Sequence, residues 1–347
     1  MVFHAIGLMS GTSLDGLDIC LARFEKQHGW SFRILKAETL PYSTEWESKL
    51  RNSIFLSAEE LLELHSEFGF YLGRSVKNFI ERHQLTDMEL IASHGHTVFH
   101  QPHKKFTLQI GDGRAIKMET HLPVIYDFRS QDVLMGGNGA PLVPIGDELL
   151  FPQYDACVNL GGFSNISLKI NKLRISFDIA PVNIILNALA KQFNKNFDEN
   201  GNLARAGEIN EPLLKKLNSL PFYRQPPPKS LGIEWCNEHI FPLFQDVKAL
   251  DLLATCTEHA AVQISEVLNE NRLEKVLFTG GGTYNAYLTE RIQAKTNAEI
   301  IIPDKDLIDF KEALIFAFMG VLRMNNEINV LASATGSSRD HCSGIIA

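Results

Sequence analysis

The sequence has few cysteines, no paired cysteine motif and no long apolar run, and each absence argues against a class of protein. Its five cysteines are scattered and include no Cys-x-x-Cys pair, which disfavours a disulfide framework and a thiolate zinc site. The longest apolar run, residues 313–322, is far short of the roughly 20 residues that span a bilayer. No basic segment precedes an apolar stretch near residue 1, so no signal peptide is expected. We therefore expect a cytoplasmic protein without membrane contact.

Positive charge is also scarce. The 347 residues carry a formal net charge of -8 and show no basic stripe, which argues against a nucleic-acid partner. The length predicts two domains.

Residues 6–22 carry the most informative pattern. An apolar run enters a turn of small, hydroxyl and acidic residues and leaves as an alternating strand, which predicts a β-hairpin. No Gly-Lys-Ser/Thr follows, so the turn is not a Walker loop. Its backbone N–H groups, hydroxyls and carboxylates suit ATP phosphates, with Asp15 holding Mg²⁺ through water. The predicted ATP-binding residues here are Gly11, Thr12, Ser13, Asp15, Gly16 and Asp18.

Two later glycine turns follow predicted strands. Gly161 and Gly162 repeat the opening theme in weaker form, and residues 280–282 follow the strand 275–279. One glycine turn is common in any α/β protein, but three in this order favour two domains that grip one triphosphate. The additional predicted ATP-binding residues are Gly161, Gly162, Gly280, Gly281, Gly282 and Asn285.

The remaining elements follow from local signals. Ser57 and Glu60 form a capping box before a helix that is predicted to end near His83. Residues 136–144, with three glycines and two prolines, predict a loop or hinge. Other predicted strands are 89–92, 107–111, 123–126, 173–178 and 300–302, and other predicted helices are 181–193, 252–269 and 312–324.

Asp178 lies at the end of a predicted strand and before a predicted helix. A carboxylate there could act as a general base near the γ-phosphate or a sugar. It could equally cap the helix, a role that suits aspartate. The residues alone leave both alternatives open.

Polar residues after the strand 89–92 suggest a substrate loop. His94, His96, His100 and His103 match no standard zinc spacing, so a sugar-contacting loop with His94 and Thr97 is favoured over a metal site. Arg129 could clamp a substrate carboxylate, or it could pair with Asp127 or Asp132.

Together these residues resemble the anhydro-N-acetylmuramic acid kinase family of the actin, Hsp70 and hexokinase group, over nearly the whole chain. The hallmark is residues 9–18, and the most specific block runs from Tyr126 to Asp147. Further matching segments are 93–97, 108–113, 159–162, 197–207, 227–234, 279–285, 312–317 and 335–336.

The resemblance implies an α/β fold of two ribonuclease-H-like (actin-like ATPase) domains with a central cleft. The expected limits are residues 1–130 joined by about 330–347, and residues 131–330. It also allows a homodimer.

The implied reaction transfers the ATP γ-phosphoryl to O6 of 1,6-anhydro-N-acetylmuramic acid. Water opens the anhydro ring at C1, which gives N-acetylmuramic acid 6-phosphate, a step in the recycling of cell-wall sugar. The family base aligns with Asp178, and the resemblance adds Asn183 and Glu312 to His94, Thr97 and Arg129 as substrate-binding residues.

The chain departs from the family pattern after the base. The family has Asp-x-Gly-Pro-Gly-Asn, whereas this chain has Ala180 and Val182 at the glycine positions. This predicts a reshaped sugar pocket. It also keeps two alternatives open: a kinase for a related sugar, and a nucleotide-gated binding protein without turnover. His96, where the family has glutamine, is a smaller departure.

Overall fold

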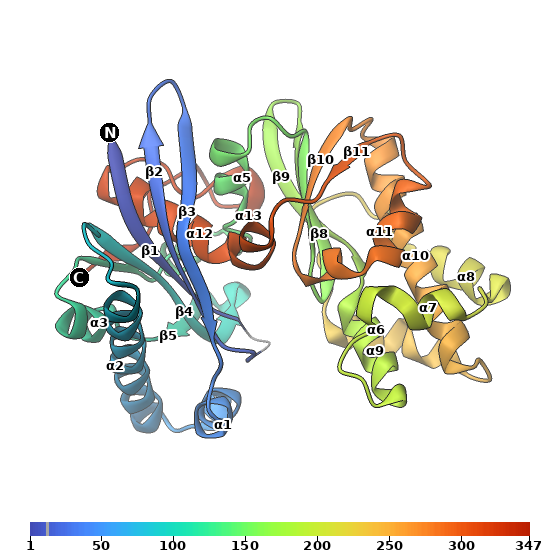
Figure 1. Ribbon diagram of the computed structural model, residues 1–347, viewed down its shortest axis with the longest axis horizontal. Coiled ribbons are helices and arrows are strands. Elements are labelled where there is room, and N and C mark those ends of the chain that lie inside the picture. The colour runs from blue at the N-terminus through green and yellow to red at the C-terminus, as the bar shows by residue number, and fades with distance from the viewer. Residues whose placement is uncertain (12–13) are drawn as a thin grey trace. The chain divides into compact units, whose positions relative to one another are not determined.

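The computed structural model describes residues 1–11 and 14–347, which form two compact units (Figure 1). Unit 1 comprises Met1–Phe151 and Phe310–Ala347, and unit 2 comprises Pro152–Asp309. The units thus divide at 151/152 and 309/310 rather than at 130/131 and about 330. The glycine-rich loop stays within unit 1, because Asn138 N donates to Thr335 O at 2.8 Å.

Unit 1 is built on a seven-stranded sheet of order β12-β6-β4-β1-β2-β3, with β5 paired to β4. Neighbours β1, β2 and β3 are antiparallel, whereas β4 lies parallel to both β1 and β6. The strands are β1 (Val2–Ser10), β2 (Leu17–Lys26), β3 (Trp30–Leu40), β4 (Leu90–Gln101), β5 (Phe106–Ile110), β6 (Val124–Tyr126) and β12 (Ile345–Ile346).

Helices cover the two faces of this sheet. Alternation along β1 places Ile6 and Leu8 in a buried cluster with Phe68 of α2. Gly7, between them, meets α12, where a Cβ would overlap the Ala313 carbonyl oxygen. The helices are α1 (Thr44–Asn52), α2 (Ala58–His83), α3 (Gly113–Thr120), α4 (Ser130–Leu134), α5 (Pro144–Leu150), α12 (Lys305–Met324) and α13 (Ala332–Thr335), with 3-10 turns at Ser53–Phe55 and Pro102–Lys104.

Unit 2 is built on a five-stranded sheet of order β11-β10-β7-β8-β9. Neighbours β7, β8 and β9 are antiparallel, and β10 lies parallel to β7 and β11. The strands are β7 (Ala156–Leu160), β8 (Phe163–Ile170), β9 (Leu173–Pro181), β10 (Lys275–Thr279) and β11 (Glu299–Ile301).

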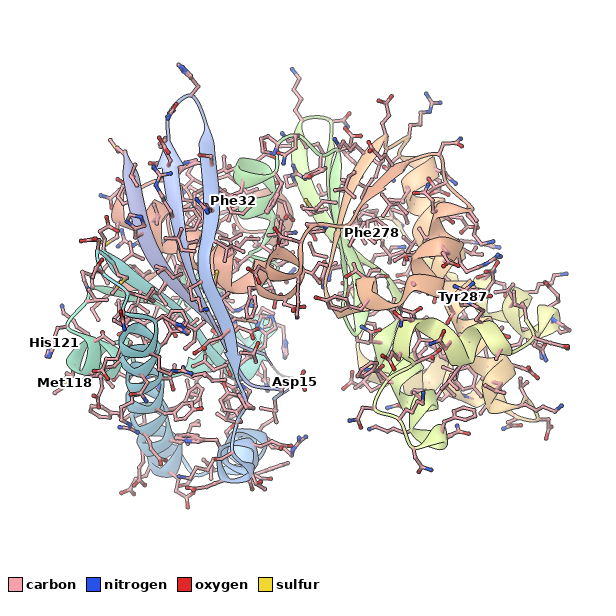
Figure 2. All side chains as sticks on the ribbon, in the orientation of Figure 1. Asp15, Phe32, Met118, His121, Phe278 and Tyr287 are labelled. Carbon is pink, nitrogen blue, oxygen red and sulfur yellow. The ribbon has the colours of Figure 1, made fainter. Side chains whose placement is uncertain are left out.

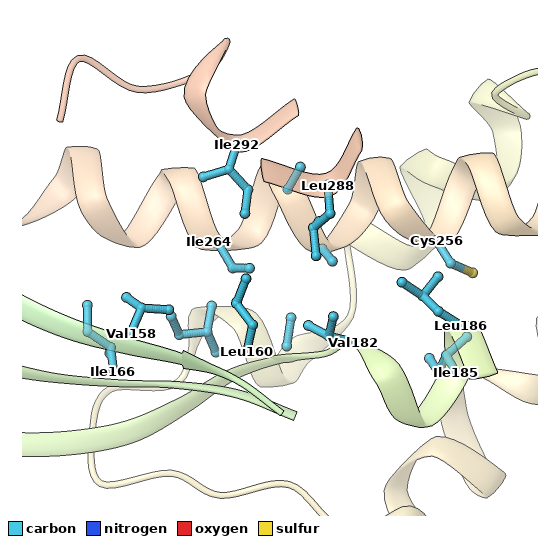
Figure 3. Packing of buried hydrophobic residues seen from close by; sticks show 14 of the residues in the cluster. Val158, Leu160, Ile166, Val182, Ile185, Leu186, Cys256, Ile264, Leu288 and Ile292 are labelled. Atoms are coloured by element: carbon cyan, nitrogen blue, oxygen red, sulfur yellow. The ribbon is translucent and has the colours of Figure 1, made fainter. Parts of the chain in front are cut away.

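The core of unit 2 lies between this sheet and α10. Figure 3 shows Val158 and Leu160 of the sheet facing Ile264 of α10 and Leu288 of α11. The helices are α6 (Asn183–Ala190), α7 (Asn202–Ala206), α8 (Glu211–Asn218), α9 (Ile233–His239), α10 (Ala249–Glu270) and α11 (Ala286–Gln293). The 3-10 turns are Lys191–Phe193, Glu199–Gly201, Pro221–Arg224, Phe241–Phe244 and Gly281–Tyr284.

The two sheets share one topology. Each has three antiparallel strands in sequence order, followed on the side of the first strand by parallel strands. This is the arrangement of a ribonuclease-H-like domain, so the predicted α/β fold class with two such domains is confirmed. Of the helices formed by residues 1–11 and 14–347, none has the length and apolarity that crossing a bilayer requires.

Candidate functional site

The opening hairpin of unit 1 forms as predicted, with β1 paired to β2. Thr12 and Ser13 lie outside the described residues. Asp15 is exposed at the end of the hairpin (Figure 2), whereas Asp18 Oδ1 accepts a 2.6 Å hydrogen bond from Thr39 Oγ1. A Cβ on Gly16 would lie 2.5 Å from the Leu40 carbonyl oxygen, so this turn requires glycine. Asp15 is therefore the carboxylate that is open to a ligand on the described part of the turn.

His94 lies within β4, because the strand continues through the segment predicted as a loop. Its Nε2 accepts a 2.9 Å hydrogen bond from Arg129 Nε, and its Nδ1 lies 2.9 Å from the Gly95 carbonyl oxygen. Burial, and then the charge of Arg129, hold the pKa of His94 well below its ordinary value. His94 is therefore neutral, with its proton on Nδ1.

Arg129 makes two contacts that fix its guanidinium. Besides His94, it reaches the Gly139 carbonyl oxygen through Nη1 at 2.6 Å. No ion pair joins Arg129 to Asp127 or Asp132 within residues 1–11 and 14–347. Burial lowers the pKa of Arg129 to about 10, and the charges of Glu312 and Asp132 oppose that shift. Arg129 stays a cation with an oriented fork.

Thr97 and Glu312 belong to the same unit as Arg129. Thr97 is half-buried in β4 and accepts a 3.3 Å hydrogen bond from Gln109 Nε2. Glu312, on α12, is an exposed residue by its total surface, although its carboxyl is surrounded by protein. Surrounding protein raises its pKa, and the charges of Arg129 and Lys311 act against that increase. Glu312 is thus electrostatically coupled to Arg129.

A buried hydrogen-bond chain at the end of β1 was not predicted from the sequence. Tyr42 donates to Ser10 Oγ at 2.7 Å, and Ser10 Oγ lies 3.1 Å from His96 Nδ1. The Ser10 hydroxyl therefore links the Tyr42 hydroxyl to the imidazole of His96. Burial lowers the pKa of His96 to about 4. This chain fixes the last residue before the candidate phosphate turn.

Asp178 lies inside β9 rather than at its end. The N-cap of α6 is Val182, so the capping alternative for Asp178 is wrong. The register shifts between Ser164 and Asn165, whose partners are Ala180 and Asp178. The extra residue in β9 forms a β-bulge, which redirects the neighbouring side chain.

A distant segment holds the Asp178 carboxylate. Leu231 N donates to Asp178 Oδ2 at 2.8 Å, and Asp178 N donates to the Lys229 carbonyl oxygen at 3.1 Å. Partial burial raises the pKa of Asp178, and the Leu231 hydrogen bond opposes this increase. A half-buried carboxylate with a raised pKa and a fixed orientation suits a general base.

The two glycine turns of unit 2 lie beside each other. A Cβ on Gly280 would come within 2.5 Å of Asn159 Oδ1, and one on Gly282 within 2.8 Å of the Leu160 carbonyl oxygen. A Cβ on Gly281 would meet nothing within 4 Å. The outer side of the 280–282 turn is therefore open backbone that a ligand could approach.

The Gly161 and Gly162 carbonyl oxygens bind the start of α6. Gly162 O accepts from Val182 N at 2.9 Å and from Ile184 N at 3.1 Å, while Gly161 O accepts from Asn183 N at 3.3 Å. The Asn183 side chain turns back to the Leu160 carbonyl oxygen at 3.4 Å. Asn285 caps α11 by accepting from Leu288 N at 3.0 Å. Gly161, Gly162, Asn183 and Gly282 thus form one cluster.

Ala180 and Val182, which replace the family glycines, are both wholly buried in the apolar core of unit 2. Figure 3 shows Val182 among the core residues, near Leu160 and Leu186. Their side chains therefore fill the core, and the structure gives no support to the prediction that they reshape a pocket.

Mg²⁺ prefers oxygen ligands, above all carboxylates, phosphates and water. Among the described residues no three His, Cys, Asp or Glu side chains gather in a metal-binding group. Magnesium bound with a nucleotide needs only one or two carboxylates, because phosphates and water supply the other ligands. The exposed Asp15 carboxylate fits that requirement.

Comparison with known proteins gives a consistent family match. The profile of the anhydro-N-acetylmuramic acid kinase family matches residues 3–347. The chain is 33% identical to an anhydro-N-acetylmuramic acid kinase of Francisella tularensis subsp. novicida, over 96% of each chain. It is 35% identical to one of Pasteurella multocida, over 96% of this chain and 94% of that one.

Solved structures are more distant. A Clostridium difficile activator of 2-hydroxyisocaproyl-CoA dehydratase, solved with ADPNP, has a TM-score of 0.45 and 14% identity over 93% of this chain and 97% of that chain. A Streptomyces griseus ROK family glucokinase has a TM-score of 0.42 and 11% identity over 91% and 98%. These scores are too low to support an argument. The family match over residues 3–347 and the identities above 30% are sufficient: the chain belongs to the anhydro-N-acetylmuramic acid kinase family.

Proposed function

We propose that this protein transfers the γ-phosphoryl group of ATP to O6 of 1,6-anhydro-N-acetylmuramic acid while water opens the anhydro ring, which yields N-acetylmuramic acid 6-phosphate. The proposal combines the family membership with one observation, the oriented Asp178 carboxylate of raised pKa. In this reaction the water oxygen bonds to C1 as a base takes its proton, the C1–O6 bond breaks, and O6 bonds to the γ-phosphorus while the bond from that phosphorus to ADP breaks and ADP leaves.

Asp178 is the proposed base that accepts a proton from the attacking water. Its Oδ2 is engaged by Leu231 N, which leaves Oδ1 as the oxygen for the proton. Because the pKa of Asp178 is raised, its carboxylate is a stronger base than that of an exposed aspartate. One base is sufficient, since O6 leaves the bridge as it gains the phosphoryl group.

His94, Thr97, Arg129, Asn183 and Glu312 are the proposed sugar-binding residues. Arg129 uses Nε and Nη1 within the protein, and its Nη2 makes no hydrogen bond among the described residues. This donor is suited to the lactyl carboxylate of N-acetylmuramic acid. His94 holds the guanidinium as a neutral acceptor, so it adds no positive charge beside the arginine.

The proposed nucleotide-binding groups are the backbone of the 280–282 turn and the Gly161–Gly162 turn in unit 2, and the hairpin turn with Asp15 in unit 1. Magnesium bound with ATP would neutralise phosphate charge. Asp15 would hold the hydrated ion, and backbone N–H groups of the turns would bind phosphate oxygens.

The test supplies Mg-ATP and the anhydro-sugar in ¹⁸O-labelled water. The expected product is a sugar phosphate whose ring is open and which carries ¹⁸O at C1. Asp178→Asn should abolish product while nucleotide binding persists. Asp246→Asn is the matched control, because Asp246 is exposed and has a φ of 60°, which asparagine tolerates.

Asp178→Asn should also raise the thermal unfolding midpoint at neutral pH. A raised carboxyl pKa stabilises the fold below the unfolded pKa, and this contribution is lost as the pH rises through the folded pKa. Full turnover by Asp178→Asn would refute the assigned base. If the wild-type protein binds ATP but turns over no sugar, it is instead a nucleotide-gated binding protein.

A further inference from the structure

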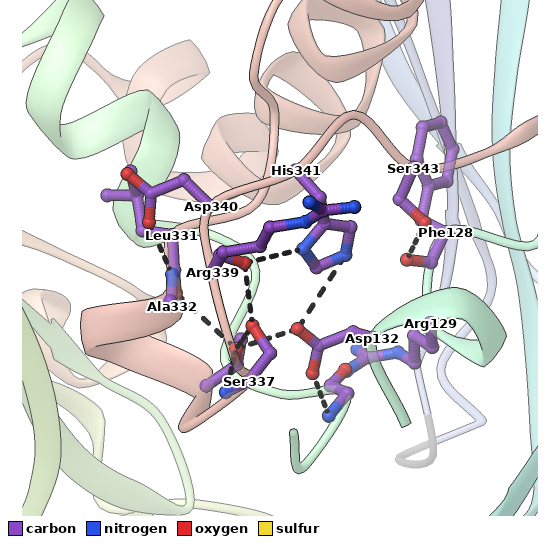
Figure 4. Close-up of polar contacts among 12 residues, drawn as sticks. Phe128, Arg129, Asp132, Leu331, Ala332, Ser337, Arg339, Asp340, His341 and Ser343 are labelled. Atoms are coloured by element: carbon purple, nitrogen blue, oxygen red, sulfur yellow. Dashed lines mark hydrogen bonds and ion pairs between the residues drawn. The ribbon is translucent and has the colours of Figure 1, made fainter. Parts of the chain in front are cut away.

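Asp132 is a buried acidic residue that the proposed reaction does not use. It lies on α4 with no exposed surface. Burying a carboxylate is costly unless hydrogen bonds replace its water. Its Oδ1 accepts from Thr335 Oγ1 at 2.7 Å, and its Oδ2 accepts from Gly139 N at 2.7 Å. Figure 4 shows this carboxylate between the C-terminal segment near Ser337 and the turn that follows α4.

The turn of residues 136–139 wraps closely around that carboxylate. A Cβ on Gly137 would overlap Asp132 Oδ2, and Gly137 N donates to the Asp132 carbonyl oxygen at 2.9 Å. Gly139 has a φ of 68°, a conformation that strongly favours glycine. The turn is therefore built to fit Asp132.

The Gly139 residue connects Asp132 to Arg129. Its N–H donates to Asp132, and its carbonyl oxygen accepts from Arg129 Nη1 at 2.6 Å. The other fixed donor of Arg129, Nε, binds His94. A movement of Gly139 would therefore move the guanidinium or break one of its two contacts.

Thr335 holds this arrangement from the C-terminal segment. It is fully buried, its hydroxyl donates to Asp132, and its carbonyl oxygen accepts from Asn138 N at 2.8 Å. Thr335 thus binds both the carboxylate and the turn that the carboxylate organises. His341 Nε2 lies 3.7 Å from Asp132 Oδ1, farther than the Thr335 hydroxyl.

We propose that Thr335 and Asp132 are positioning residues that set the Arg129 fork for the substrate carboxylate through the Gly139 residue. The proposal rests on the proposed function, because it requires Arg129 to contact the sugar. It predicts that loss of the Thr335 hydroxyl impairs sugar binding far more than nucleotide binding.

Thr335→Val tests this, because valine keeps the shape and removes the donor. It should raise the KM for the anhydro-sugar about tenfold, the effect of about one net hydrogen bond, and leave the KM for ATP within twofold. Thr335→Ser should restore wild-type values. The matched control is Thr120→Val on α3 in the same unit, since Thr120 Oγ1 makes only local contacts among the described residues: it donates to the Ile116 carbonyl oxygen at 2.9 Å and accepts from Leu122 N at 3.5 Å.

A double-mutant cycle with Arg129→Lys asks whether Thr335 acts through Arg129. Lysine keeps the charge but lacks the fork, so Thr335→Val should add little to the KM defect of Arg129→Lys. Independent, multiplying effects would overturn the proposal, as would an unchanged sugar KM in Thr335→Val. If Thr335→Val lowers kcat and raises the KM for ATP as much as the KM for the sugar, the role of Thr335 is merely structural and the proposal is overturned.

Asp132→Asn keeps the test open if Thr335→Val does not fold. Thr335 and Gly139 donate to different oxygens of Asp132. Asparagine replaces one of these oxygens with an NH₂ group that cannot accept, so the sugar KM should again rise selectively. A wild-type enzyme that turns over the sugar, with normal sugar KM in both variants, refutes the positioning role alone. A wild-type protein that turns over no sugar refutes the proposed function, and the positioning role with it.

Discussion

Val182→Ala is expected to destabilise unit 2 without changing sugar binding. Val182 has no exposed surface and packs in the cluster that contains Leu160, Leu186 and Leu288. The substitution removes two buried methyl groups, worth about 0.8 kcal/mol each. The unfilled cavity raises the expected loss of unfolding free energy to roughly 2–3 kcal/mol.

Fluorescence of Trp235 can report this loss for unit 2 alone. The other tryptophans, Trp30 and Trp46, belong to unit 1, so replacing both with phenylalanine leaves one probe. Trp235 packs on Phe222, with ring centroids 5.4 Å apart, and its emission should change on unfolding. Guanidinium unfolding curves of Val182→Ala and its parent in this background give the difference in unfolding free energy, from the shift in the denaturation midpoint at constant slope.

Val262→Ala is the matched control for this measurement. Val262 is half-buried on α10 and lies outside the core cluster, so its loss should stay near 0.5 kcal/mol. The kinetic part of the prediction is an unchanged KM for the anhydro-sugar in folded Val182→Ala. A stability loss below about 0.5 kcal/mol together with a tenfold change in that KM would refute the core assignment, and would show that Val182 lines the pocket.

Two further predictions concern buried ionisable groups. Arg291→Leu removes a bidentate partner of the buried Glu258, with N–O distances of 2.7 and 3.0 Å. Lys295 Nζ stays 2.6 Å from Glu258 Oε1, so the expected cost in guanidinium unfolding is about 2 kcal/mol, that of hydrogen bonds to a charged group. Glu258→Gln should then cost less in this variant than in the wild type, and equal costs would contradict coupling. His96→Gln should reduce the decrease in unfolding free energy that occurs as the pH is lowered from about 6.5 to 4. Burial lowers the pKa of His96 to about 4 in the folded protein. As the pH is lowered, His96 is therefore protonated in the unfolded chain before it is protonated in the folded protein, and the free energy of unfolding decreases. Thermal midpoints at pH 7 and 5 check this, and an unchanged difference would refute it.

Local signals in the sequence predicted much of the fold. The capping box at Ser57 and Glu60 begins α2, and its helix ends at His83 as expected. The strand at Lys275–Thr279 was predicted with its full bounds. These elements depend on caps and short-range periodicity, which a single sequence displays directly.

Several predictions were wrong where a segment's structure depends on strand pairing with residues far away in the sequence. The 93–97 segment looks like a polar turn, yet it remains strand because β4 pairs with β5 through His96 and Thr97. Asp178 was placed at a strand end because Pro181 suggested a helix start, whereas pairing with β8 extends β9 to Pro181. The inward direction of Ala180 likewise follows from the register of β9 against β8, which pattern alone did not reveal. Val182 lies beyond β9 and is held by its N–H bond to the Gly162 carbonyl oxygen.

The same long-range hydrogen bonds explain why some segments resemble the family although they contain no proposed catalytic or binding residue. The 227–231 segment offers no base or phosphate-binding turn, but the backbone at Lys229 and Leu231 fixes Asp178 from another part of the unit. Thr335 likewise reaches Asp132, which is 203 residues away in the sequence. A carboxylate or guanidinium placed within half an ångström of its working position requires such support. Family resemblance in these segments therefore follows from the geometry that the candidate groups require.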